Sequence, residues 1–110
     1  MKYIIGSYVT APSLTSIDKK SENQFYSSLI KIPQIRGLEI PFWGENIHPF
    51  GNDYMLQHLN PNWENTMTCV PCSTLPSLQN TSVGLASNNE DSRLYSLKLH
   101  RNAFETFNLI

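Results

Sequence analysis

The stretch Ile35–Trp43, "IRGLEIPFW", decides the fold expected for this chain. Its charged residues are Arg36 and Glu39, and the others form a nearly continuous apolar run. Such a run is typical of a strand that is buried on both faces of a parallel sheet. Alternation along the strand places two sets of side chains on opposite faces: Leu38, Ile40 and Phe42 on one, and Gly37, Glu39, Pro41 and Trp43 on the other.

Two further segments have the composition of strands. The first, "KYIIGSYVT" (Lys2–Thr10), is rich in Ile, Tyr, Val and Thr and stops at "APS". The second, "NTMTCVPC" (Asn65–Cys72), combines Thr, Met and Val with two cysteines. Because β-branched and aromatic residues favour strands, we predict strands at 2–10, 35–43 and 65–72.

Helical patterns lie between these strands. The first predicted helix has Ser21 as its N-cap and ends before Pro33, since proline cannot continue a helix. Its apolar residues have helical spacing: Phe25, Leu29 and Ile32. A second, short helix is predicted after the loop "GENIHPFG", capped by Asn52 or Asp53 and reaching Leu59.

A longer helix is predicted from Glu90 onward, after a polar segment that forms a turn or a short helix. Asn88 or Asn89 is a suitable N-cap, and Glu90 and Asp91 suit the positive end of the helix dipole. One stripe along this helix holds Leu94, Leu97, Arg101 and Phe104, and Phe107 and Ile110 extend it.

The order of these elements predicts an α/β fold of three consecutive βα units with a parallel sheet. A complete (β/α)₈ TIM barrel takes roughly 250 residues, whereas this chain has 110. We therefore expect residues 1–110 to be a single segment, the N-terminal part of a TIM-barrel domain. A three-stranded sheet also leaves two open edges, so an α/β interaction module that self-associates or is completed by another chain stays open as an alternative.

Charge and hydropathy exclude several classes of protein. Eight Lys plus Arg stand against nine Asp plus Glu, which gives a net charge of −1. The basic stripe of a nucleic-acid-binding protein is missing, so we expect no nucleic-acid partner. In the opening "MKYIIGSYVT", the run of apolar residues before Gly6 is too short for the apolar part of a signal peptide or for a membrane span. We expect a cytoplasmic protein with no membrane partner and with reduced cysteines.

The two cysteines, Cys69 and Cys72, are spaced as C-x-x-C. A dithiol oxidoreductase built on them is one alternative, but Pro76 would interrupt the long helix that lowers the first thiol's pKa in such a centre. A structural zinc site needs four ligands, and only a distant His could join this pair, so no metal site is predicted in the chain. We interpret both cysteines as small apolar residues at the end of a strand.

Several strings suggest a family. "GSYVTAPS", "IRGLEIPFWGENIHP", "TCVPC" and "GLASNNEDSR" follow one another in this order. In this order and spacing the chain resembles the N-terminal portion of xylose-isomerase-like TIM barrels, most closely a bacterial domain family of unknown function within that superfamily. The string "LEIPFWG" followed by "HP" carries the most distinctive part of the resemblance, which covers the first third or so of the family's domain.

The resemblance implies a parent activity of sugar or sugar-phosphate isomerisation or epimerisation, by proton transfer next to a carbonyl. In the isomerase and epimerase branch, the divalent-metal ligands and the acid-base carboxylates come mainly from later strands, which this chain lacks. A divalent metal is therefore expected only in a full-length parent. No cofactor is expected in this chain, and it is not expected to be catalytic alone.

Glu39 is the first candidate site residue. A carboxylate is costly to leave unpaired against covering helices, so its face should be the barrel interior, near the carboxyl-terminal rim where barrel active sites lie. We predict that it binds substrate. The structural alternative is a carboxylate that hydrogen-bonds neighbouring strands or pairs with Arg36.

Trp43 and His48 lie in or beside the loop that follows this strand. An aromatic wall and an imidazole donor would suit a sugar-like substrate, because pockets combine apolar walls with a few placed polar groups. The alternative is that Trp43 packs under the loop while His48 precedes Pro49 in a turn. His58 and His100 lie in predicted helices and are expected to face solvent.

Overall fold

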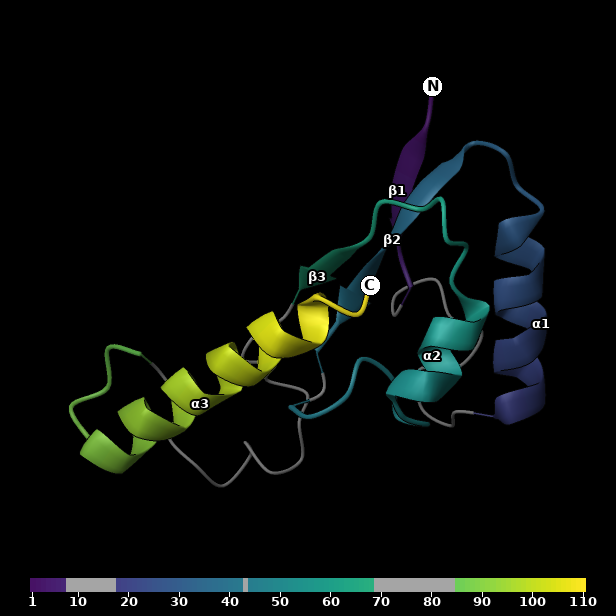
Figure 1. The fold of residues 1–110 in the computed structure, drawn as a ribbon. Coiled ribbons are helices and arrows are strands. Elements are labelled where there is room, and N and C mark those ends of the chain that lie inside the picture. The colour runs from purple at the N-terminus through teal and green to yellow at the C-terminus, as the bar shows by residue number, and fades with distance from the viewer. Residues whose placement is uncertain (8–17, 43, 69–84) are drawn as a thin grey trace.

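The computed structural model describes residues 1–7, 18–42, 44–68 and 85–110. Strands and helices alternate along the chain as three βα units (Figure 1). Their bounds are β1 Tyr3–Gly6, α1 Lys19–Ile30, β2 Ile35–Pro41, α2 Asn52–His58, β3 Thr66–Thr68 and α3 Glu90–Phe107.

The three strands form one parallel sheet in the order β1-β2-β3. This arrangement confirms the predicted α/β fold with a parallel sheet in sequential order. Residues 8–10, 43 and 69–72 of the predicted strands lie outside the described residues. Within the described part, β2 is the central strand, as its nearly continuous apolar sequence indicates.

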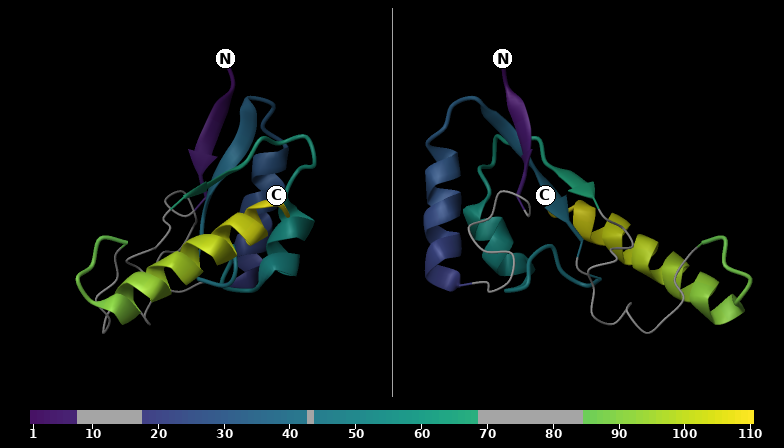
Figure 2. Two further views of the ribbon diagram at one scale, coloured as in Figure 1. Left: turned by 60° about the vertical axis from the view of Figure 1, so that its left-hand side comes forward. Right: turned by 180° about the vertical axis from the view of Figure 1, so that it is seen from behind.

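The core lies on one face of β2, where α1 and α2 pack against the sheet. Leu38 and Ile40 of β2 are both 0% exposed and share this core with Tyr26 of α1 and Met55 of α2. The two helices lie side by side, whereas α3 extends away from them, with its C-terminal end near β2 and β3 (Figures 1 and 2). The first two units are therefore more closely packed than the third.

Helix α1 begins earlier than predicted. Asp18 is its N-cap, and its carboxylate accepts hydrogen bonds from both the backbone N–H and the hydroxyl of Ser21, each at 2.9 Å. These bonds hold the pKa of the Asp18 carboxyl below its usual range. The buried face also differs from the predicted one: it consists of Glu22, Tyr26 and Leu29, while Ile32 is exposed.

Helix α2 is held by the loop before it. Gly51, with φ of 98°, occupies the N-cap position, and a positive φ of this kind favours glycine. Asn52 was expected as a cap, but its side-chain oxygen instead accepts a hydrogen bond of 2.9 Å from the backbone N–H of Ile47. Ile47 is thereby fixed in the core below the loop.

Gly37 is required by a close approach of two backbones. A Cβ atom added at this position would overlap the carbonyl oxygen of Glu64, the residue that precedes β3 by two positions. The backbone N–H of Glu64 also donates a hydrogen bond of 2.9 Å to the carbonyl of Arg36. Glycine therefore allows the segment leading into β3 to lie directly against β2.

Helix α3 begins at Glu90 with Asn89 as its N-cap, as predicted, and the Asn89 side chain accepts from the backbone N–H of Ser92 at 3.0 Å. The face of α3 that packs against the rest of the chain differs from the predicted stripe. The buried residues of α3 are Ser96, Leu99, Ala103 and Thr106. Leu94 is 52% exposed and Phe104 is 75% exposed. Within the described ranges, no helix combines the length and the apolar character needed to cross a membrane.

Candidate functional site

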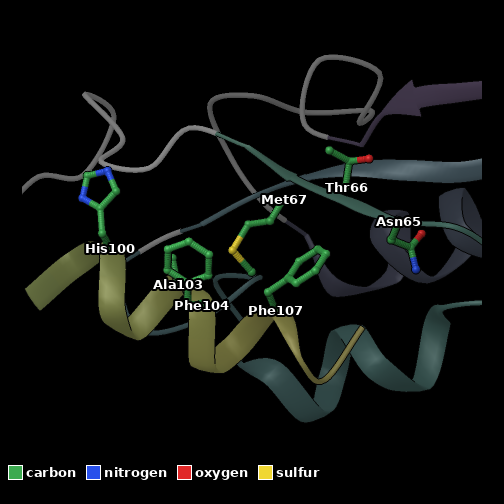
Figure 3. A pocket seen from close by; sticks show the side chains of 7 residues that line it. All are labelled: Asn65, Thr66, Met67, His100, Ala103, Phe104 and Phe107. Carbon is green, nitrogen blue, oxygen red and sulfur yellow. The ribbon is translucent and has the colours of Figure 1, made fainter. Parts of the chain in front are cut away.

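The face of the sheet opposite α1 and α2, here called the open face, is defined by Ile4, Gly6, Glu39 and Thr66. Gly6, Glu39 and Thr66 are partners in the strand register, so they form one row across the three strands. Figure 3 shows that the side chains of Thr66 and Met67 leave β3 on opposite sides, with Met67 directed toward α3. The row thus combines a residue without a side chain, a carboxylate and a hydroxyl.

Glu39 is held by its backbone while its side chain is exposed. Its carbonyl oxygen accepts hydrogen bonds from both the backbone N–H and the hydroxyl of the buried Ser7, each at 3.0 Å. Among the described residues, none forms a hydrogen bond or ion pair with the Glu39 carboxylate. Arg36, the partner considered in the structural alternative, pairs with Glu64. The carboxylate is therefore available to a ligand on the open face.

His48 lies away from Glu39, in the loop between β2 and α2. It is 5% exposed, and its Nε2 lies 2.9 Å from Oε2 of Glu22, which is 4% exposed. Its other ring nitrogen, Nδ1, accepts a hydrogen bond of 3.0 Å from the backbone N–H of Phe50. Glu39 is an exposed strand residue and His48 a buried loop residue, so the structure does not bring them together.

These contacts define the protonation state of His48. Because Nδ1 accepts a hydrogen bond, the ring proton is on Nε2, which donates to the Glu22 carboxylate. Burial lowers the pKa of His48, an effect that the Glu22 carboxylate opposes and that His58 reinforces. Both nitrogens of the neutral ring already have protein partners, so the ring fixes the loop onto α1.

Aromatic side chains surround this pair. The Tyr54 ring lies 4.7 Å from the His48 ring and 4.4 Å from the His58 ring, measured between centroids. The Tyr54 hydroxyl donates to the side-chain oxygen of Asn23 at 2.7 Å, which adds a second link between α2 and α1. Burial raises the pKa of Tyr54, and the Glu22 carboxylate adds to this shift. The cluster is well suited to join the two helices.

The sequence analysis missed the contact between Glu22 and His48. Glu22 lies in the first turn of the predicted helix and is not among the candidate residues named from the sequence. A signal was nevertheless present, because Glu22, Tyr26 and Leu29 have the i, i+4, i+7 spacing of one helix face. A carboxylate on an otherwise apolar face indicates a buried partner, since an unpaired buried charge is costly.

Trp43, Cys69 and Cys72 lie outside the described residues. In the parts of the chain that the structure describes, no group of three or more His, Cys, Asp or Glu side chains could hold a metal ion. The site that these parts define is therefore the Glu39 row on the open face, with the buried pair fixing the loop that follows the same strand.

Comparison with known proteins gives one family and one relative. Residues 4–110 match the model of the family described as "Domain of unknown function (DUF4862)". The chain is 34% identical over 108 residues to an uncharacterised protein of Salmonella typhimurium, an alignment that covers 98% of this chain and 34% of the relative. The chain thus spans about a third of the relative's length. No solved structure matches it.

Proposed function

The chain belongs to the family described as a domain of unknown function (DUF4862), and we propose that it supplies the first three βα units of a (β/α)₈ barrel acting on a sugar-like substrate. The reaction is isomerisation or epimerisation of a sugar or sugar phosphate, and the 110-residue chain alone is not catalytic. The parallel order β1-β2-β3, with helices α1 and α2 on one face, supports the barrel.

The observation that carries this proposal is the exposed Glu39 carboxylate near the carboxyl end of the central strand. If the sheet closes into a barrel, the face opposite the helices becomes the interior. Active sites in such barrels lie at the carboxyl ends of the strands. Glu39 then lies beside the substrate, and Gly6 on the neighbouring strand leaves space next to it.

Each residue in the proposed site has a distinct role. The Glu39 carboxylate accepts hydrogen bonds from substrate hydroxyls, and the Thr66 hydroxyl in the same row adds a donor and an acceptor. His48 acts indirectly, since its bonds to Glu22 and Phe50 hold the loop after β2 in place. Acid-base groups and any divalent metal are held by later strands of the complete barrel.

The reaction is tested by screening the Salmonella relative with aldoses, ketoses and their phosphates in D₂O, with Mg²⁺ or Mn²⁺ present. Proton transfer next to a carbonyl replaces a substrate C–H bond by C–D, which NMR detects even when the product is unknown. We expect exchange in at least one sugar class. An absence of exchange across the panel would contradict isomerisation or epimerisation by proton transfer next to a carbonyl.

The role of Glu39 is tested in a barrel assembled from residues 1–110 and the remaining part of the relative. Loss of a hydrogen bond to a charged group costs about 1.5–3 kcal/mol, so Glu39→Gln should raise KM by at least about tenfold. Glu64→Gln is the matched control, because Glu64 precedes β3 at the amino end of the sheet and pairs with Arg36. Equal kinetics for both variants would exclude Glu39 from the site.

A further inference from the structure

Helix α3 has apolar residues on two sides. Leu99 and Ala103 are buried on one side. Phe107, four positions after Ala103, lies beside them and is 43% exposed, and Leu97 and Phe104 are exposed further round the helix. Contiguous exposed apolar surface marks an interaction site. The exposed side of α3 is therefore a candidate docking surface.

A groove between α3 and β3 continues this surface. It has a volume of about 340 Å³. Figure 3 shows Met67 directed from β3 toward Phe104 and Phe107 of α3. The lining is mainly apolar: Met67, Ala103, Phe104 and Phe107, with Asn65, Thr66 and His100 completing it. An occupant of this groove would need apolar side chains.

The strand beside the groove is at the edge of the sheet. In the described part of the chain, β3 pairs with β2 on one side and with no strand on the other. An edge strand presents backbone N–H and C=O groups that can pair with an added strand about 4.8 Å away. Alternate side chains of that strand would point toward the α3 side of the sheet, as Met67 does.

We propose that the groove and the free edge of β3 bind a further β-strand with apolar side chains, of the kind that the part of the Salmonella relative outside the matched region can supply. This inference rests on the proposed barrel and names the partner of its third unit. The Salmonella relative extends well beyond the region matched by this chain, which covers 34% of it. The relative thus has the additional length from which such a strand can come.

A second copy of the chain fits this surface less well. Strand β3 spans three residues, so pairing between two β3 edges would supply few hydrogen bonds. A longer strand can pair with β3 and continue over α3, where Phe104 and Phe107 lie. The occupant is therefore a strand of the kind that the rest of the relative can supply, and a dimer of residues 1–110 is the competing outcome.

Binding is tested by co-expressing residues 1–110 with the remaining part of the Salmonella relative and measuring complex formation without substrate. The region of the relative that this chain matches is the positive control for a binding-competent partner. Phe104→Glu should weaken binding at least tenfold, since it places a charge in the groove. Ile30→Glu is the matched control, because Ile30 is 45% exposed near the end of its helix and outside this groove.

Both variants should melt within a few degrees of the unaltered chain, because both side chains are exposed. The inference is overturned if the relative's remainder binds the relative's own matched region but not residues 1–110, or if Phe104→Glu binds as tightly as Ile30→Glu. A dimer of residues 1–110 that Phe104→Glu abolishes would also overturn it. Binding without C–H exchange in the sugar screen would reject the proposed reaction while keeping the docking surface.

Discussion

The α1–β2–α2 region and the β3–α3 region contain similar amounts of apolar sequence but use it differently. In the first, Leu38, Ile40 and Met55 are fully buried, and the buried polar side chains have partners, as in the Glu22–His48 pair. In the second, Phe104 is mostly exposed beside an open groove. The first region holds a packed core of its own, whereas the second presents apolar surface for another segment.

The largest expected effect comes from breaking the buried pair. In His48→Leu the Glu22 carboxylate stays buried without its imidazole donor, and leaving a buried charged group without that hydrogen bond costs about 3 kcal/mol or more. Urea unfolding monitored by circular dichroism should show this decrease in the free energy of unfolding. A decrease below about 1 kcal/mol would mean that water reaches the carboxylate, because exposed pairs contribute about that much.

The double variant Glu22→Leu with His48→Leu is the control. It removes the charge together with its partner, so it should be more stable than His48→Leu alone. A double variant that is the less stable of the two would show that the polar pair stabilises this region more than apolar packing can.

A matched pair of substitutions compares the two regions directly. Leu38→Ala removes a fully buried side chain and should cost about 2–5 kcal/mol. Leu94→Ala makes the same chemical change on the exposed side of α3 and should alter stability by no more than about 0.5 kcal/mol. Urea unfolding measures both. Similar costs would show that the exposed side of α3 is packed in solution.

Acidification should weaken the first region, with a smaller effect than removing the ring. Burial lowers the pKa of His48 in the folded chain, so the unfolded chain takes up the proton at higher pH. The stability that the neutral ring contributes is fully present above the unfolded pKa of about 6.5 and is lost as pH falls below it.

Urea unfolding between pH 7.5 and 5 should therefore show this decrease in the unaltered chain. The decrease should be reduced in the double variant Glu22→Leu with His48→Leu. Nitrogen NMR of the ring at pH 7 should find the proton on Nε2. A proton on Nδ1 would contradict the hydrogen bond from Phe50.

The smallest effect is expected for the exposed ion pair of Arg36 and Glu64. Both side chains are more than half exposed, at 52% and 64%. Exposed pairs contribute about 0–1 kcal/mol, so Glu64→Gln should change the free energy of unfolding by no more than that. High salt should reduce even this difference. A cost as large as that of His48→Leu would show that burial does not govern the strength of these pairs.

The sheet could be predicted because its signals are local. The apolar run of β2 indicated a central parallel strand, and Asn89 was correctly expected among the caps of α3. The start of α1 was harder to place, since Asp18 and Ser21 are both good cap residues and they bond to each other. Local patterns do not decide which of two such residues begins the helix.

The candidate site was less accessible to sequence reasoning. The Glu22–His48 contact joins residues 26 positions apart, and neither residue type by itself indicates a partner at that distance. The stripe on α3 presents a different problem. Its sequence shows which residues share a face, but the face that packs depends on which surfaces the rest of the domain offers.

Gly37 has a consequence for how this sequence can vary. Because an added Cβ would overlap the Glu64 carbonyl, every other amino acid would move apart the backbones that join β2 to β3. A saturation library selected for folded protein should therefore retain glycine at 37, while accepting many residues two positions later at Glu39, whose side chain is exposed. Selection for activity instead of folding should then restrict position 39 as well. A position that accepts many residues in the folding screen but few in the activity screen is one whose side chain is needed for the reaction.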